Sequence, residues 1–247
     1  MESGEQGNHD IFKAYEKIEA FAKKWRKPMQ DFCKDNDQRL AVWCLWSQYN
    51  RGLQSLKNVS AVGDAYACHI IDRCCLECQI SILAIAKNPE LGKCYLDYDR
   101  DACIRFFKAE GTLDDDELPV DPVQYMKEHF DCDLEGKTNT SWCNTRTLFE
   151  KSGKKNKYRV YLTDCQVSHG TVTGIRIMNA VDLLPVKEQR EITITFFTGH
   201  IVSYIATTRN VIDLLFGTLY TPEKERCKND FAGVAISINE IINNLNG

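Results

Sequence analysis

The chain has 247 residues, of which 31 are Lys or Arg and 35 are Asp or Glu, so its formal net charge is −4. Its apolar fraction of 43% and charged fraction of 27% are ordinary for a globular protein and exclude an intrinsically disordered chain. No uncharged apolar run reaches the roughly 18 residues that a membrane span needs, and the polar start at 1–6 is unlike a secretory signal. We therefore expect a soluble, cytoplasmic protein without a membrane partner.

Twelve cysteines are the one unusual count in the composition. They are scattered along the chain, and without an export signal they are expected to be reduced thiols packed between helices. The sharpest cluster, Cys75-Leu76-Glu77-Cys78, is a CxxC motif, but a structural zinc site usually needs a second pair or spaced histidines. We expect no cofactor and no metal, and a metal site at Cys75 and Cys78 stays open as the alternative.

Apolar residues recur at helical spacing along most of the chain. In the first half this pattern predicts helices over 11–28, 37–56, 60–87 and 91–106. Pro28 is expected to end or kink the first helix, because its ring fixes φ and removes a hydrogen-bond donor. Asp37 is expected to cap the second helix, and Ser60 to start the third.

The middle of the chain is different, since residues 110–122 hold six acidic residues and two prolines without helical periodicity. Such a segment is typical of a surface loop. After it, helices are predicted over 122–130, 141–152, 157–182, 186–216 and 222–245. Gly170 and Gly174 are expected to break the helix at 157–182, and the β-branched run within 190–196 leaves a short strand there as an alternative.

The expected fold is therefore all-α, a multi-helix bundle. It consists of an N-terminal helical half at 1–109, the acidic loop at 110–122 and a C-terminal helical half at 123–247. No internal repeat or low-complexity tract is evident, so we expect these parts to form one compact domain.

Polar residues inside the apolar stripes are the first candidates for function. His69, Arg73 and Glu77 are spaced by four, so they lie on one face of a helix. A buried Arg is tolerable only when it is paired, and Glu77, one turn away, is the expected partner. The pair either locks helix packing or forms a polar pocket in which Arg73 holds an anionic group through its planar fork of donors.

Two further clusters stand out. Tyr161, Ser168 and His169 precede Gly170, and the spacing places Tyr161 and His169 on one face near a helix end. His169 either carries protons or caps the last carbonyls of the helix. The other cluster is Arg209-Asn210, where Asp213 lies four residues after Arg209 and a local ion pair is expected.

Complete phosphate-binding loops and hydrolase motifs are missing from the sequence. Small ribonucleases of the HEPN group carry an Arg followed by a His about one and a half helical turns later, and Arg209-Asn210 resembles the start of that motif without its His. A ribonuclease would therefore need His169 to approach Arg73 or Arg209 in space. RNA binding has no support from the charge of −4.

Two blocks of the sequence resemble a bacterial, all-helical family of domains of unknown function, catalogued as number 5677. The first block contains Arg73 and Glu77, and the second contains Tyr161 and Ser168-His169-Gly170-Thr171. The resemblance spans about residues 60–185 and implies bacterial cytoplasmic proteins, some in phage-defence or toxin-like settings. It implies no biochemical activity and only marks Arg73, Glu77, Tyr161 and His169 as positions worth testing.

These observations favour a helical module that binds a partner protein or a small anionic ligand; whether it is an enzyme stays open. The candidate pocket residues are His69, Arg73, Glu77, Tyr161, Ser168, His169, Arg209 and Asn210. One alternative is a HEPN-like, metal-independent ribonuclease that uses His169 with Arg73 or Arg209. The other is a dimerisation bundle whose apolar surface comes from Trp25, Trp43 and Trp46.

Overall fold

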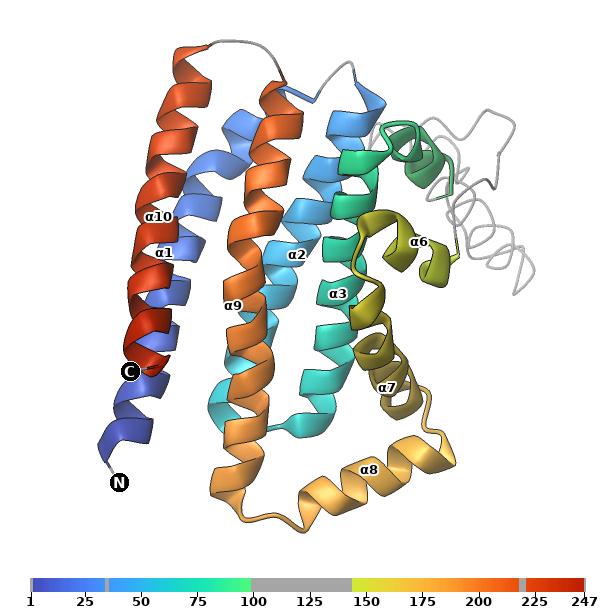
Figure 1. Cartoon of the computed structure of the whole chain (residues 1–247), viewed down its shortest axis with the longest axis vertical. Helices are drawn as coiled ribbons and strands as arrows, with labels where there is room; N and C mark the ends of the chain where they lie inside the picture. The colour runs from blue at the N-terminus through green and yellow to red at the C-terminus, as the bar shows by residue number, and fades with distance from the viewer. Residues whose placement is uncertain (1, 34–35, 99–143, 218–220, 247) are drawn as a thin grey trace, which may run out of the picture.

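The computed structural model describes residues 2–33, 36–98, 144–217 and 221–246. Within these ranges every regular element is a helix, which confirms the predicted all-α fold. The long helices form an elongated bundle (Figure 1): α1 (Glu2–Asp31), α2 (Asp37–Val62), α3 (Ala65–Lys87), α9 (Val186–Phe216) and α10 (Pro222–Asn246). Shorter elements lie between α3 and α9 in the chain: a helical stretch at 91–98, α6 (Thr145–Ser152), the 3-10 turn η1 (Lys155–Lys157), α7 (Tyr158–Ser168) and α8 (Val172–Asp182).

The first two connections of the bundle are set by capping residues. Asn36 accepts a hydrogen bond from the backbone of Arg39 at 2.9 Å, so Asn36 is the cap of α2 and the predicted cap Asp37 is its first helical residue. Gly63 ends α2 at a φ of +80°, a conformation that favours glycine. Asp64 then caps α3, and the chain reverses within two residues, so α2 and α3 are antiparallel neighbours.

In this half, the predicted helix start at Ser60 is wrong, and of the two outcomes expected for Pro28, an end or a kink, the helix does not end at that residue. Ser60 lies in the last turn of α2 and not at the start of a helix, because its hydroxyl is buried and donates to the carbonyl of Thr193 at 3.0 Å. Pro28 lies inside α1, which ends at Asp31. The missing donor of Pro28 costs one hydrogen bond close to the helix end, where the following turn still continues the helix.

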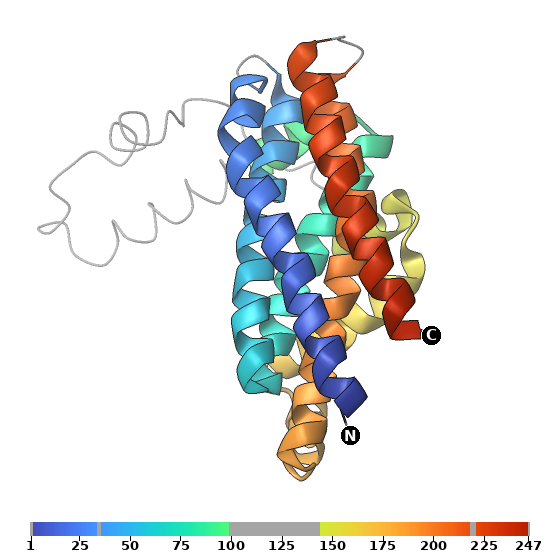
Figure 2. The ribbon, with the colours of Figure 1, turned by 90° about the vertical axis from the view of Figure 1, so that its left-hand side faces the viewer.

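The core lies where α9 packs against α2 and α3, with α1 and α10 packed beside each other across another face of α9 (Figure 1; Figure 2). The largest fully buried side chains are Trp46, Tyr49, Phe149, Phe197, Tyr204 and Phe216. They come from α2, α6 and α9, so the middle of the bundle joins elements far apart in the sequence.

The tryptophans belong to this interior. Trp46 is 1% exposed and its Nε1 donates to Thr208 Oγ1 at 3.2 Å, while Trp25 is 5% exposed and donates to Asp230 Oδ2 at 2.8 Å. Trp43 is partly buried against the core. The expectation that these residues supply apolar surface for dimerisation is therefore wrong for Trp25 and Trp46, which join helices within one chain.

α9 is continuous through 190–196, so the alternative strand at this position is wrong. Thr193 Oγ1 donates to the carbonyl of Arg190 at 2.9 Å, and Thr195 Oγ1 donates to the carbonyl of Glu191 at 2.8 Å. Both hydroxyls thus bond to the preceding turn, and Ile194 is buried. Burial along a long helix outweighs the local β preference of these residues.

The segment predicted as one broken helix is divided into α7 and α8. Gly170 adopts a φ of +61°, and Thr171 caps α8 by accepting a hydrogen bond from Gly174 N at 3.1 Å. The predicted break near Gly170 and Gly174 is confirmed. It lies at Gly170, whereas Gly174 lies in the first turn of α8, close to Gln166 of α7.

The predicted acidic loop at 110–122, the short helix at 122–130 and the second half of the helix at 91–106 lie outside the described residues. The predicted division into two halves around that loop stays a prediction. Within the described part of the chain, no helix is both long and apolar enough to span a membrane.

Candidate functional site

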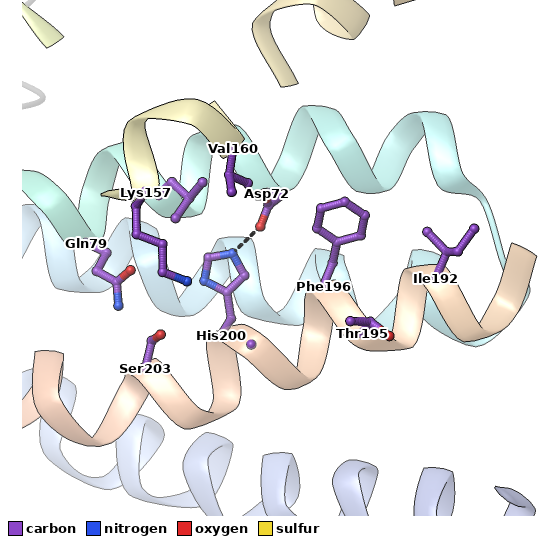
Figure 3. Close-up of a pocket in the computed structure, with 11 residues that line it drawn as sticks. Asp72, Gln79, Lys157, Val160, Ile192, Thr195, Phe196, His200 and Ser203 are labelled. Atoms are coloured by element: carbon purple, nitrogen blue, oxygen red, sulfur yellow. Dashed lines mark hydrogen bonds and ion pairs between the residues drawn. The ribbon is translucent and has the colours of Figure 1, made fainter. Parts of the chain in front are cut away.

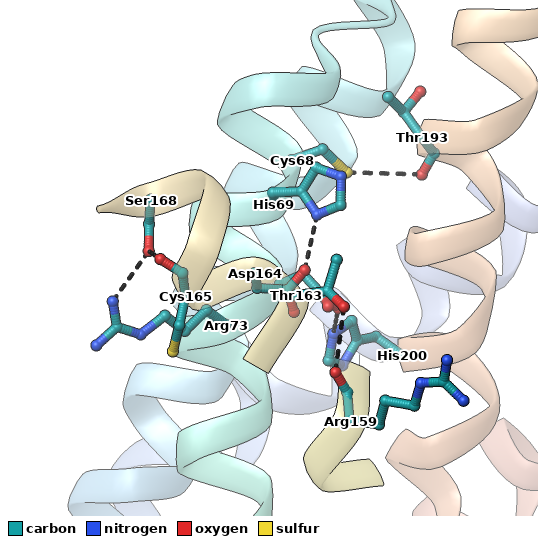
Figure 4. Close-up of polar contacts among 11 residues, drawn as sticks. Cys68, His69, Arg73, Arg159, Thr163, Asp164, Cys165, Ser168, Thr193 and His200 are labelled. Carbon is teal, nitrogen blue, oxygen red and sulfur yellow. Dashed lines mark hydrogen bonds and ion pairs between the residues drawn. The ribbon is translucent and has the colours of Figure 1, made fainter. Parts of the chain in front are cut away.

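Five polar groups lie together where α7 packs on α3, and we name them the Arg73 cluster: Arg73, Glu77, Tyr161, Ser168 and His169. Arg73 Nε donates to Glu77 Oε1 at 3.3 Å, so the expected pairing is present. Arg73 Nη1 donates to Ser168 Oγ at 3.0 Å (Figure 4) and lies 3.1 Å from His169 Nε2. The Tyr161 hydroxyl donates to the same Glu77 oxygen at 2.8 Å.

The cluster follows from the local structure of two helices. Arg73 and Glu77 are one turn apart on α3, and α7 ends at Ser168, which places His169 at the exposed helix end. The side chains of Arg73 and Glu77 are 25% and 41% exposed. With Tyr161 they line a cavity of about 490 Å³, so part of the cluster is open to a ligand.

His69 is not part of this cluster. It is 5% exposed, and its Nδ1 lies 2.7 Å from Oδ1 of Asp164 on α7 (Figure 4). The carboxyl groups of Asp164 and Asp72 lie close enough to shift each other's pKa, and Asp72 Oδ1 lies 2.6 Å from His200 Nε2 on α9. We name this set the buried carboxyl–imidazole chain: His69, Asp164, Asp72 and His200.

The two carboxyl groups of this set differ in their proton affinity. Asp72 Oδ2 and Asp164 Oδ2 are buried without a hydrogen-bond partner, while the Oδ1 atom of each lies beside a histidine. Burial, together with the neighbouring carboxyl group of Asp72, raises the pKa of Asp164 to about 7. Burial alone would raise the pKa of Asp72 too, but the hydrogen bond and charge of His200 hold it below its ordinary value.

The Asp72–His200 end of the buried carboxyl–imidazole chain lies beside a second cavity. Asp72 and His200 line a cavity of about 390 Å³ between α3, α7 and α9, together with Lys157 of η1 (Figure 3). On the other side of His200, the Tyr49 hydroxyl lies 3.3 Å from Nδ1 and donates to the His200 carbonyl at 3.2 Å. Both ring nitrogens of His200 are therefore engaged, and the imidazole is fixed in orientation.

Arg209 and Asn210 lie apart from both groups. Arg209 lines a cavity of about 290 Å³ between α9 and α10, and Asn210 Nδ2 donates to the carbonyl of Ala206 at 2.7 Å. The predicted ion pair from Arg209 to Asp213 is wrong, since Asp213 pairs with Lys228 of α10 at 3.8 Å. Arg209 and Asp213 are four residues apart on α9, but Lys228 of the neighbouring helix pairs with Asp213 instead.

Comparison with known proteins identifies the family to which the sequence is similar. The model of a family of unknown function, DUF5677, matches residues 39–182. The chain belongs to this family. The DUF5677 segment supplies α2, α3, α6, α7 and α8, and thus the whole Arg73 cluster, whereas His200 comes from α9 beyond the match. No curated protein and no solved structure matches the chain.

Sequence reasoning on this DUF5677 chain missed Asp72, Asp164, His200 and Lys157. Two of them carried a usable signal: Asp72 follows His69 by three residues on the same apolar stripe, and His200 lies between Phe197 and Tyr204 on a face that is otherwise apolar. Asp164 and Lys157 had no such signal, because their partners come from α3 and α9.

The CxxC cysteines are buried on α3, with Cys75 1% and Cys78 8% exposed. Burial raises the pKa of both thiols, that of Cys78 to about 12, which disfavours the thiolate that binds metals. Within the described residues, no group of three or more His, Cys, Asp or Glu side chains is placed to hold a metal ion.

Proposed function

We propose that this DUF5677 chain binds a small anionic ligand that carries a phosphate group, and that the Arg73 cluster holds it. The observation that supports this is the position of Arg73 Nη1, 3.0 Å from Ser168 Oγ and 3.1 Å from His169 Nε2. A guanidinium and an imidazole thus converge at a partly exposed point, and both are groups that bind phosphate oxygens. The Ser168 hydroxyl, which donates to the carbonyl of Cys165 at 3.3 Å, accepts from Arg73 and holds the guanidinium in place.

Glu77 and Tyr161 support the proposal by positioning Arg73. Glu77 accepts hydrogen bonds from Arg73 Nε and from the Tyr161 hydroxyl, while the Tyr161 ring lies 5.7 Å from the centre of the guanidinium. Burial raises the pKa of Tyr161, so its hydroxyl stays protonated and keeps donating to Glu77. A guanidinium held in one plane loses less conformational entropy when it binds an oxyanion.

The test is titration of the full chain with inorganic phosphate and with adenosine 5′-monophosphate, followed by calorimetry and ³¹P NMR. Wild-type protein is expected to bind, and Arg73→Ala and His169→Ala are each expected to weaken binding by about tenfold or more, since each removes a charge-assisted contact. Arg226→Ala is the control, because it removes an exposed Arg–Glu pair of α10 (2.8 Å) far from the cluster.

Arg73→Lys separates ligand binding from helix packing. It keeps the positive charge beside Glu77 but loses the planar fork, so we expect weaker phosphate binding with a nearly unchanged melting temperature. If wild-type protein binds neither probe while Arg73→Ala lowers the melting temperature, the cluster only locks α3 to α7 and the proposal fails.

A metal-independent ribonuclease is the second candidate. This hypothesis requires His169 to lie close to Arg73 or Arg209, and His169 Nε2 lies 3.1 Å from Arg73 Nη1. In this hypothesis Glu77 takes the proton of a ribose 2′-hydroxyl, whose oxygen attacks the adjacent phosphorus. The P–O5′ bond breaks as His169 protonates O5′, and Arg73 stabilises the charge on the phosphoryl oxygens. The products are a 2′,3′-cyclic phosphate and a 5′-hydroxyl.

Cleavage of single-stranded RNA in the presence of EDTA tests this candidate. His169→Ala and Glu77→Gln are each expected to slow cleavage by about 100-fold or more, the usual contribution of a general acid or base. Cleavage that persists equally in both variants, or no cleavage by wild-type protein, would rule the ribonuclease out. A partner protein, a bacterial cytoplasmic location and a phage-defence or toxin-like setting stay predictions.

A further inference from the structure

The cavity beside His200 is separate from the Arg73 cluster and has the character of a ligand site. Its volume of about 390 Å³ is in the range of small-molecule pockets. Leu76 of α3, Val160 of α7 and Ile192 and Phe196 of α9 form its apolar wall. The wall is therefore built from three helices that the fold holds in fixed positions.

Lys157 gives the cavity its charge. Figure 3 shows its side chain extending past Gln79 toward His200 and Ser203. Lys157 forms no ion pair with any residue that the structure describes, although its ammonium group lies in a cavity with a mostly apolar wall. An ammonium group in such a place is stabilised by an anion.

The other polar groups fit a single anionic group. The carboxylate of Asp72 also lines the cavity, but its Oδ1 is bonded to His200 and it forms no ion pair with Lys157 among the residues that the structure describes. Gln79 donates its amide to Thr207 at 3.0 Å and stays fixed, and the Ser203 hydroxyl lines the cavity as a further donor. One amine and one hydroxyl match the two oxygens of a carboxylate, whereas a phosphate dianion calls for more donors.

From this arrangement we infer that the cavity binds a small organic carboxylate, with its carboxylate on Lys157 and Ser203 and its apolar body against Phe196, Val160 and Leu76. The site is independent of the proposed phosphate site, since it shares no side chain with the Arg73 cluster. Its neighbour, the buried carboxyl–imidazole chain, forms a rigid floor that fixes His200 beneath the ligand.

The test uses three ligands that share a phenyl-alkyl body and differ in their polar end group, which is an anion, a neutral alcohol or a cation: 4-phenylbutyrate, 4-phenylbutanol and 4-phenylbutylamine. Calorimetry and ligand-observed NMR on the full chain are expected to give the tightest binding for 4-phenylbutyrate. Lys157→Met should raise its Kd at least tenfold and change that of 4-phenylbutanol less than twofold. Lys155→Met, in the same 3-10 turn but on its exposed side, is the matched control and should change neither.

A second variant tests the place of the ligand. A Cβ at Gly199 would meet no atom within 4 Å, and Gly199 lines the cavity, so the larger side chain of Gly199→Leu is expected to occupy the space of the ligand. This variant should abolish binding of 4-phenylbutyrate, while Gly233→Leu on α10, where a Cβ also meets nothing, should not. Equal affinity for the alcohol, an unchanged Kd in Lys157→Met, or no binding by wild-type protein would each overturn the inference.

Discussion

The two buried carboxyl groups of Asp72 and Asp164 are the least expected feature at the scale of single residues. Both side chains are at most 5% exposed, and each carboxyl group contacts a histidine. These His–Asp contacts join three helices, α3, α7 and α9. The raised pKa of Asp164 makes the stability of the fold sensitive to pH.

The sign of that dependence follows from Asp164. Its pKa is about 7 in the folded chain against 3.8 in an exposed aspartate, so the native state binds more protons between these pH values. The contribution of Asp164 to stability therefore falls as pH rises from about 4 to about 7, by at most about 1.4 kcal/mol per pH unit for one proton.

Asp164→Asn should remove this slope, because an amide does not titrate in this pH range. We expect its free energy of unfolding in urea to be flatter than that of the wild type between about pH 4 and 7. Asp182→Asn, an exposed aspartate at the end of α8, should keep the wild-type slope. Parallel pH profiles for wild type and Asp164→Asn would contradict the raised pKa of Asp164.

Spacing within one helix predicted one ion pair correctly and one wrongly, and it predicted no partner across helices. Arg73 and Glu77 pair as their spacing of four residues predicts, whereas Asp213 pairs with Lys228 of another helix. His69 was correctly placed on an inward face, but its partner Asp164 is 95 residues away along the chain. Spacing reports only the neighbours that one helix provides, and the buried carboxyl–imidazole chain needs three helices.

At the scale of elements, the turn between α7 and α8 depends on close backbone contact. A Cβ at Gly174 would lie 2.1 Å from the carbonyl oxygen of Gln166 and 2.8 Å from Val167 Cα. Backbone atoms cannot move away as a flexible side chain can. α8 must therefore shift relative to α7 if residue 174 carries any side chain.

Gly174→Ala is expected to lower the free energy of unfolding by about 1–3 kcal/mol, the usual cost of overpacking. Gly199→Ala is the matched helical control, since its Cβ meets nothing within 4 Å, and it should be neutral or raise stability by up to about 1 kcal/mol through helix propensity. Urea unfolding of both variants measures the difference. A stabilised Gly174→Ala would show that α7 and α8 are not in close contact.

Element positions were predictable where periodicity was long and unbroken. α9 runs over Val186–Phe216, as the apolar pattern predicts, and α10 begins at Pro222. The boundary between α2 and α3 was misplaced to Ser60, because a serine that bonds across helices and one that caps a helix look alike in sequence. Gly63-Asp64, three residues later, is the pair that ends one helix and starts the next.

At the scale of the whole molecule, the family match and the core do not coincide. Residues 39–182 contain α3 and α7 but not α9, which packs against both α2 and α3. α9 contributes several of the most buried side chains, among them Phe197, Tyr204 and Phe216. The matched segment by itself would expose the apolar faces of α2 and α3 that α9 covers.

A fragment of residues 39–182 is therefore expected to lack cooperative unfolding, whereas the full chain should unfold in a single steep transition. Circular dichroism during urea titration distinguishes the two. Adding α9 by extending the fragment to residue 217 should restore part of the cooperativity. A fragment of 39–182 that unfolds as steeply as the full chain would show that α9 is an accessory to the fold.

The buried thiols allow the local opening of the bundle to be measured by alkylation. Cys33, Cys68 and Cys227 are at most 1% exposed, and burial raises the pKa of each to about 12. An alkylating reagent, which needs an accessible thiolate, can modify them only when the surrounding helices separate. Cys33 follows α1, Cys68 lies in α3 and Cys227 in α10, so their separate labelling rates rank the order in which these helices come loose.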